Sequence, residues 1–284
     1  MKNKLYFIGY GNMAEAIYQR IDKKLFGKIF LIEKNSERRV YINEKSYKKT
    51  QVLKELNGIK FNNSDIVLLA VKPNQIKSVC EEINSLILGK KDIPIIISIA
   101  AGVTTTAIKN FIINNLTNLQ NDIDIFRAMP NLCAKIKKST SIIFYYNNLN
   151  NNLKKSIESL FSCIGSIIII TDEEQLHSYT ALTGSGPAYV MYFIEAMYEA
   201  CENFNIDDSL KFKVILDMAI GTLDLIEKKS KGIEDIKKMR NEVTSKGGTT
   251  EAAIKSLSDN SFSKILRDAV NEAKIKSIDL SIKD

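Results

Sequence analysis

The sequence predicts an α/β fold in two parts, an N-terminal domain with a mainly parallel sheet and an all-helical C-terminal domain. In the first part, short runs of β-branched residues alternate with segments of helical periodicity, which is typical of a parallel sheet covered by helices. After Thr171 this alternation stops and successive helical patterns follow. We therefore expect one domain over residues 1–171 and a second over residues 172–284.

The strands and helices follow from local patterns along the chain. The predicted strands are Leu5–Ile8, Ile29–Ile32, Ile66–Val71, Ile93–Ile99, Ile123–Arg127, Ser141–Tyr145 and Ser166–Ile170. Between residues 46 and 61 we expect a strand over Ser46–Thr50 and a short helix over Gln51–Leu56. The predicted later helices are Asp172–Leu182, Pro187–Phe204, Ser209–Lys229, Ile233–Val243, Thr249–Leu257 and Phe262 to the end.

The overall composition is that of a compact globular protein. Hydrophobic residues make up 45% and charged residues 26% of the 284 residues, which excludes a disordered chain. The net charge of +7 is spread in pairs such as Lys23-Lys24 without a basic helix, so we expect no nucleic-acid partner. No apolar run approaches the roughly 20 residues of a membrane span. We therefore expect no membrane association and a cytosolic, cytoplasmic location.

Cysteine and histidine are too sparse to indicate a metal centre. Cys80, Cys133, Cys163 and Cys201 are widely separated and form no CxxC pair, which supports neither a zinc knuckle nor a disulfide framework. His177 is the single histidine, which excludes a His-rich metal site. We predict no metal ligand in this chain.

A glycine motif near the N-terminus predicts a dinucleotide site. Gly9, Gly11 and Ala14 form G-x-G-x-x-A directly after a predicted strand and at the start of an amphipathic helix. Gly9 permits the tight turn, and Gly11 lets a pyrophosphate approach the backbone at the helix N-terminus. We therefore assign Gly9, Gly11, Asn12 and Met13 to cofactor binding in a Rossmann-like domain.

The end of the second predicted strand bears on the choice of dinucleotide. Glu33 stands where an acidic residue holds the adenine-ribose diol, which favours NAD, and we assign Glu33 and Lys34 to cofactor binding. If Glu33 turns away, the 2′-phosphate of NADPH could be bound by the polar and basic residues that follow, which are Lys34, Asn35, Ser36, Arg38 and Arg39. A solvated helix start explains the two arginines equally well. NADPH and NADH therefore both remain open.

Two later strand ends also point to the cofactor. Ala70-Val71-Lys72-Pro73 ends one predicted strand, where the ligand crevice of an open α/β sheet lies, and we assign all four residues to cofactor binding. Asn131 follows another strand and is a candidate partner for a nicotinamide amide, with a plain turn as the alternative.

The helical part contains two glycine-rich turns that open helices. The segment 183–189 reads TGSGPAY and the segment 243–250 reads VTSKGGTT. Both place small residues and free amides at a helix N-terminus, which suits anion binding.

Together these motifs resemble the pyrroline-5-carboxylate reductase family across nearly the whole chain. The matching segments are FIG-GNMA from Phe7, AVKP from Ala70, RAMPN from Arg127, GSGPAY from Gly184, and VTS-GGTT from Val243. The resemblance implies reduction of 1-pyrroline-5-carboxylate to L-proline by NADPH or NADH, the last step of proline biosynthesis. It also implies a helical domain that interlocks with a second subunit, and hence a homo-oligomer, a dimer or a multiple of dimers, with the active site formed across the dimer.

The resemblance also implies roles for the glycine-rich turns. Thr250 becomes the catalytic hydrogen-bond partner of the imine nitrogen, with helix capping as its alternative or additional role. The amides of Gly247, Gly248 and Thr249 would hold the substrate carboxylate, with help from Ser185. Lys246 departs from the family, which usually has Pro at that position.

Two other functions fit parts of the sequence. A β-hydroxyacid dehydrogenase also joins such domains but needs a general base, for which Lys246 or His177 would have to serve. A nucleotide-sensing or scaffolding protein would keep the fold without turnover, although the glycine-rich turns of the helical part argue against it.

Overall fold

The computed structural model describes residues 3–45, 47, 49–113, 123–145 and 151–281. The chain forms two compact units, one of residues 1–184 with 273–284 and the other of residues 185–272. The first unit therefore extends past the predicted domain boundary at residue 171 and includes the end of the last helix. The division into domains 1–171 and 172–284 stays a prediction.

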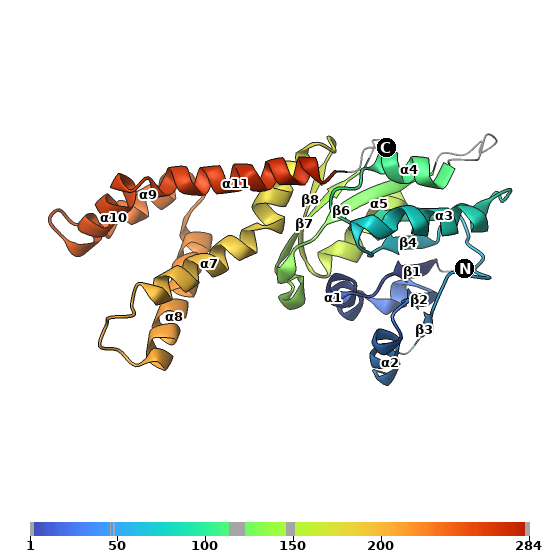
Figure 1. Ribbon diagram of the computed structural model, residues 1–284, viewed down its shortest axis with the longest axis horizontal. Coiled ribbons are helices and arrows are strands. Elements are labelled where there is room, and N and C mark those ends of the chain that lie inside the picture. Colours follow the sequence, from blue (N-terminus) through green and yellow to red (C-terminus); the bar gives the residue numbers. More distant parts are fainter. Residues whose placement is uncertain (1–2, 46, 48, 114–122, 146–150, 282–284) are drawn as a thin grey trace. The chain divides into compact units, whose positions relative to one another are not determined.

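The first unit is built on one eight-stranded sheet with the order β3-β2-β1-β4-β5-β6-β7-β8 (Figure 1). Every neighbouring pair is parallel except β6 with β7, so the predicted mainly parallel sheet is confirmed. The strands are β1 (Lys4–Ile8), β2 (Lys28–Ile32), β3 (Thr50–Leu53), β4 (Ile66–Leu69), β5 (Ile95–Ser98), β6 (Ile125–Met129), β7 (Ser139–Phe144) and β8 (Gly165–Ile170).

Helices cover both faces of this sheet. Because side chains alternate along a strand, Leu5 and Phe7 of β1 face one apolar core while Tyr6 and Ile8 face the other. Helices α1 (Asn12–Arg20), α2 (Ser36–Glu44) and α5 (Asn151–Ser162) pack on the first face, and α3 (Ile76–Ile87) and α4 (Thr105–Ile113) pack on the second. Burial on both faces explains why the strands are nearly continuous apolar runs.

The stretch around β3 differs from its prediction. The expected short helix over Gln51–Leu56 is wrong, because Thr50–Leu53 form a strand parallel to β2. Its register pairs Val52 with Leu31, and backbone pairing with an existing edge outweighs a weak local helix pattern. The expected strand over Ser46–Thr50 falls partly outside the described residues.

Short helical segments connect the larger elements of the first unit. Three 3-10 turns are η1 (Lys23–Leu25), η2 (Pro73–Gln75) and η3 (Leu132–Ile136). The predicted helix over Asp172–Leu182 is instead α6 (Gln175–Tyr179) followed by the π-helical turn η4 (Thr180–Gly184). The Thr180 hydroxyl donates to the Leu176 carbonyl at 2.7 Å, and such side-chain bonds to the preceding turn accompany departures from regular α-helix.

The second unit is helical, as the sequence predicts. It contains α7 (Gly186–Glu199), α8 (Asp208–Lys229), α9 (Ile233–Glu242), α10 (Thr249–Asp259) and the first part of α11 (Phe262–Asp279). Helix α7 ends before the predicted Phe204, and α10 runs past the predicted Leu257.

Within the described residues, no helix combines the length and the apolar character needed to cross a membrane.

Candidate functional site

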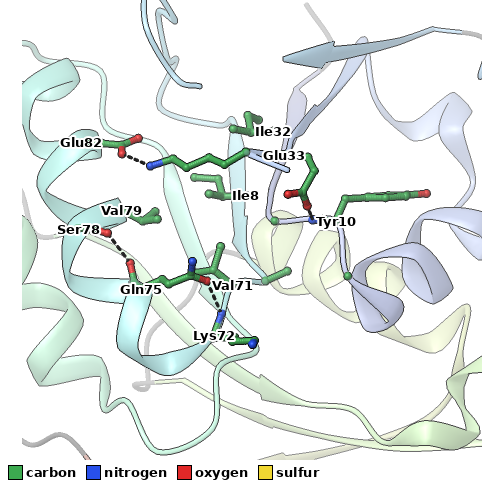
Figure 2. A pocket seen from close by; sticks show the side chains of 14 residues that line it. Ile8, Tyr10, Ile32, Glu33, Val71, Lys72, Gln75, Ser78, Val79 and Glu82 are labelled. Carbon is green, nitrogen blue, oxygen red and sulfur yellow. Dashed lines mark hydrogen bonds and ion pairs between the residues drawn. The ribbon is translucent and has the colours of Figure 1, made fainter. Parts of the chain in front are cut away.

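A pocket lies at the carboxyl ends of β1, β2 and β4 (Figure 2). The chain continues from β1 to β2 on one side of β1, while β4 lies on the other side, so this is the point at which the strand order reverses. Ligands of open α/β sheets bind at such points. The volume of about 240 Å³ is below the roughly 300–1,000 Å³ of whole-ligand sites, so the pocket has room for only part of a dinucleotide.

The pocket gathers seven of the predicted cofactor residues. These are Gly9, Gly11, Glu33, Lys34, Ala70, Val71 and Lys72. The other predicted cofactor residues, Asn12, Met13, Pro73 and Asn131, are not among its lining residues. Asn12 begins α1, Pro73 begins η2, and Met13 packs against the apolar core.

Gly9 occupies a position that admits no side chain. Its φ of +84° lies in the left-handed region, and a Cβ there would come within 2.8 Å of both the Ala70 carbonyl oxygen and a Val71 methyl group. The Gly9 amide donates to the Ile32 carbonyl at 2.8 Å, and the Ala70 amide donates to the Ile8 carbonyl at 2.8 Å. The turn therefore packs directly against the end of β4.

Gly11 differs from Gly9, because no contact within the described protein excludes a side chain at this position. Its backbone is extended, and a Cβ would meet no described atom within 4 Å. Gly11 is the N-cap of α1, and no side chain of the described residues caps the first turn. An open space before an uncapped helix N-terminus fits the pyrophosphate of a dinucleotide.

Glu33 is held in the pocket by two backbone amides. Its Oε2 accepts from the Tyr10 amide at 2.9 Å, and its Oε1 accepts from the Asn35 amide at 2.8 Å. Figure 2 shows the carboxylate directed toward Tyr10, whose ring points away from the pocket into the core. The carboxylate therefore joins the glycine turn to the start of α2.

The basic neighbours of Glu33 contact other protein groups. Arg39 Nη1 donates to the carbonyls of Glu33 and Lys34 at 2.8 and 2.7 Å. Arg38 donates through Nε to the Tyr10 carbonyl at 2.9 Å and through Nη2 to Glu15 Oε2 at 2.6 Å.

The far wall of the pocket comes from α3 and the turn before it. Gln75, Ser78, Val79 and Glu82 line it, and none of them was among the sequence-predicted site residues. Successive members are three, one and three residues apart, which places them on one face of a helix. This helical spacing after the predicted strand end is the sequence signal that could have identified them. Across the pocket, Lys34 Nζ contacts Glu82 Oε1 at 2.5 Å, and the Lys72 amide donates to Gln75 Oε1 at 3.2 Å (Figure 2).

Asn131 is the N-cap of η3, after β6. Its Oδ1 accepts from the Cys133 amide at 3.1 Å, and its own amide donates to Ser139 Oγ at 3.0 Å. The structure thus places Asn131 in a capped turn, and its contact with a nicotinamide amide stays a prediction.

The second unit carries the predicted substrate turn before α10. Gly247 has a φ of +74°, and its amide donates to Glu251 Oε2 at 2.7 Å. A Cβ on Gly248 would come within 2.6 Å of Ser245 Oγ and 3.0 Å of the Ser245 carbonyl oxygen, so a larger residue there would require Ser245 to shift. A hollow of about 730 Å³ is lined by Thr244, Gly247, Gly248, Glu251, Ala252, Ile254, Lys255, Ser258 and Asp259.

The remaining substrate candidates lie at two helix starts. Thr249 and Thr250 occupy the first turn of α10, whose N-cap is Gly248, so Thr250 does not have the capping role that was the alternative for it. Thr250 is half-buried and Lys246 is exposed. Ser185 is the N-cap of α7, and its carbonyl accepts from the Ala188 amide at 2.9 Å.

The two candidate bases of a hydroxyacid dehydrogenase occupy different surroundings. His177 is buried in the first unit, where Nδ1 lies 2.9 Å from Ser277 Oγ and Nε2 lies 3.8 Å from Glu174. Lys246 belongs to the second unit and lies on its surface. Neither lines the pocket at the carboxyl ends of β1, β2 and β4.

Comparison with known proteins gives a consistent family. Residues 173–280 match the model for pyrroline-5-carboxylate reductase dimerisation, and residues 4–102 match the model described as NADP oxidoreductase, coenzyme F420-dependent. A pyrroline-5-carboxylate reductase of Pasteurella multocida is 31% identical over 270 residues, covering 93% of this chain and 92% of the relative.

Solved structures agree. A pyrroline-5-carboxylate reductase of Coxiella burnetii has a TM-score of 0.81 and 29% identity, covering 99% of this chain and 100% of that chain. A Plasmodium falciparum pyrroline carboxylate reductase with NADP bound has a TM-score of 0.76 and 26% identity over the same shares. The chain belongs to the pyrroline-5-carboxylate reductase family.

Proposed function

We propose that this chain reduces 1-pyrroline-5-carboxylate to L-proline with NADPH or NADH, the last step of proline biosynthesis. The observation that carries the proposal is the pocket in which Gly9 fits tightly against β4 and Gly11 leaves open space before α1. That arrangement fits a dinucleotide, and the family supplies the substrate.

The reaction demands positioning more than strong acid or base chemistry. When bound, the reduced dinucleotide supplies the hydride that adds to the C=N carbon of the cyclic imine, which is C2 of the pyrroline ring. The C=N bond becomes a C–N single bond, and the nitrogen ends with one added proton. The chain must therefore orient the ring, hold its carboxylate and place a hydrogen-bonding group at the nitrogen.

Thr250 is our candidate for the group at the imine nitrogen. It lies in the first turn of α10, directly after the glycine turn, and its hydroxyl is a donor and an acceptor in one group. A hydrogen bond that strengthens as the nitrogen gains electron density lowers the barrier without an ionisable side chain.

The glycine turn is our candidate for the grip on the carboxylate. The Gly247 amide already binds a carboxylate, that of Glu251, at 2.7 Å, which supports anion binding at this turn. A substrate carboxylate that uses the same amide displaces Glu251. The amides of Gly248 and Thr249 and the side chain of Ser185 complete the proposed set.

We infer a homo-oligomer, a dimer or a multiple of dimers. The match to a dimerisation model and the many exposed apolar side chains on α7 and α8 support it. Tyr192 of α7, for example, is 72% exposed. We also infer the cytoplasm as the location, since the four cysteines are free thiols.

The test is a coupled measurement of dinucleotide oxidation and proline formation with 1-pyrroline-5-carboxylate. We expect proline to form with at least one dinucleotide, and Thr250→Ala to lower kcat about 10²-fold. Thr250→Ser keeps the hydroxyl and should retain most of the rate.

Binding of NADH and NADPH to the Thr250→Ala protein serves as the control and should be unchanged. Binding without any proline formation by the unmodified protein would refute the reductase proposal and favour a nucleotide sensor. Oxidation of β-hydroxyacids instead would favour the dehydrogenase.

A further inference from the structure

We propose that Glu33 makes this protein prefer NADH over NADPH. The inference rests on the proposed function in one respect, because it requires a nicotinamide dinucleotide in the pocket at β1, β2 and β4. It goes further by naming the residue that selects between the two dinucleotides.

The Glu33 carboxylate is fixed at the end of β2. The Tyr10 and Asn35 amides each donate to one of its oxygens, at 2.9 and 2.8 Å. Each carboxylate oxygen can accept two hydrogen bonds, so each keeps one acceptor site for a ribose hydroxyl. The carboxylate is therefore held in the pocket, and the alternative in which Glu33 turns away is not the arrangement observed.

Arg39 fixes the backbone that carries this carboxylate. One of its guanidinium nitrogens donates to both the Glu33 and the Lys34 carbonyls, at 2.8 and 2.7 Å. Arg39 thereby holds the turn after β2 closed, and it does not line the pocket.

Arg38 also stabilises this turn, through contacts with the glycine turn and with α1. It donates to the Tyr10 carbonyl at 2.9 Å and to Glu15 at 2.6 Å, and its guanidinium carbon lies 4.6 Å from the centre of the Tyr41 ring. A 2′-phosphate that recruits Arg38 must first break these contacts. The two arginines that would identify an NADPH site in the sequence thus support the position of Glu33.

Lys34 does not offset the charge of Glu33. Its side chain is 60% exposed and pairs with Glu82, another carboxylate of the pocket wall. Because the lysine is paired with Glu82, the formal charge of Glu33 is left without a partner of opposite sign among the described residues of this pocket wall. The adenosine end of the pocket therefore presents two carboxylates, Glu33 and Glu82, with one lysine between them.

This arrangement distinguishes a diol from a phosphate by charge. The diol of NADH donates hydrogen bonds to Glu33, whereas the 2′-phosphate of NADPH brings about two negative charges toward a fixed carboxylate. We expect NADH to bind about tenfold or more tightly than NADPH, because like charges at close range are strongly disfavoured.

The experiment is titration of the full-length protein with NADH and with NADPH, following nicotinamide fluorescence and heat of binding without substrate. In the unmodified protein NADH should bind more tightly. Glu33→Gln removes the charge at nearly constant shape and should bring the ratio of the two dissociation constants to about one or reverse it. Glu37→Gln, which removes an exposed carboxylate of α2 outside the pocket, should leave the ratio unchanged.

Tighter binding of NADPH than of NADH by the unmodified protein overturns the inference. This result can be obtained without any variant. A ratio that changes equally in Glu33→Gln and Glu37→Gln also overturns it, because net charge and not Glu33 then decides. Lys34→Gln adds a further check, since a selective loss of NADPH binding of more than about tenfold would assign selection to the lysine.

The outcomes also separate this inference from the proposed function. NADH preference without proline formation leaves the inference standing and refutes the reductase proposal. Proline formation with tighter binding of NADPH does the opposite. Absence of binding by either dinucleotide refutes both.

Discussion

The two compact units of this chain differ in where their apolar side chains lie. In the first unit, apolar residues are buried on both faces of the sheet, and large rings such as Tyr6, Phe7 and Phe126 are almost fully covered. In residues 185–272, all of which the structure describes, Ile215 is the single buried apolar residue. The first unit therefore has its own core, whereas the second lacks one within a single chain.

Helix α8 shows the consequence most clearly. Its exposed apolar residues include Phe212, Val214, Leu216, Met218, Ile220, Leu223 and Leu225. Their spacing distributes them around the helix and not along one stripe, and helices that are apolar all round are enclosed by other protein. The comparison teaches that the dinucleotide pocket can form in one subunit, while the second unit needs a partner, for which a second copy is our proposal.

The largest expected effect comes from placing a charge on α8. Ile220→Asp puts a carboxylate on a side chain that is 50% exposed in the single chain, and we expect loss of assembly because burying the charge costs about 3 kcal/mol or more. Light scattering coupled to gel filtration measures the molecular mass directly.

Val40→Asp is the matched control, because Val40 is 58% exposed on α2 of the first unit. It should leave the mass of the assembly unchanged. An unmodified protein that runs as a monomer, or an Ile220→Asp protein that assembles normally, would contradict the contrast between the two units.

A second prediction concerns the first unit, where two glycines of one motif have different reasons for being glycine. Gly9→Ala should cost about 2–3 kcal/mol of unfolding free energy, because the φ is positive and the Cβ meets the Ala70 carbonyl at 2.8 Å. Gly11→Ala should cost about 1 kcal/mol or less, because its Cβ meets nothing, yet it should abolish dinucleotide binding.

Urea unfolding followed by circular dichroism gives the stabilities, and NADH titration gives the binding. Equal loss of stability in both variants would show that Gly11 is structural and would remove the main support for a pyrophosphate before α1.

Sequence alone predicted the parts of the fold that local patterns encode. The alternation of strands and helices and the helical second part are confirmed, because two-face burial and helical periodicity leave strong signals. The strand β3 was predicted too early, over Ser46–Thr50, because Thr50–Leu53 become a strand only through pairing with β2, which no local pattern records.

In the candidate site too, some features follow from local sequence patterns and others depend on how distant elements pack. The turn at Gly9 follows from the glycine spacing, because its positive φ is a local backbone demand, whereas Gly11 leaves open space before α1. The contribution of α3 through Gln75 and Glu82 depends on where that helix packs. The orientation of Arg38 was equally undecidable from sequence, since its partner Glu15 lies 23 residues away in the chain.

The smallest expected effect is a pH dependence confined to the first unit. Burial by itself raises the pKa of the Glu15 carboxyl, but hydrogen bonds from Lys45, Tyr41 and Arg38 outweigh it and hold the pKa below its ordinary value of 4.5. A carboxyl with a lowered pKa in the folded state stabilises the fold above its unfolded pKa, and this contribution is lost as the pH falls through the folded value.

The free energies of unfolding of the unmodified protein and of Glu15→Gln should therefore differ by about 1–2 kcal/mol near pH 7 and converge as the pH falls through the lowered pKa of Glu15. Urea unfolding at a series of pH values checks this, with Glu37→Gln as the control, because Glu37 is exposed at the start of the same helix that carries Arg38. A difference that does not shrink at all as the pH is lowered into the acid unfolding range would mean that Glu15 stabilises the unit by packing and not by charge. Because Glu15 joins α1 to Arg38, loss of its charge should also loosen the turn that holds Glu33, and the preference for NADH should then weaken in Glu15→Gln at neutral pH.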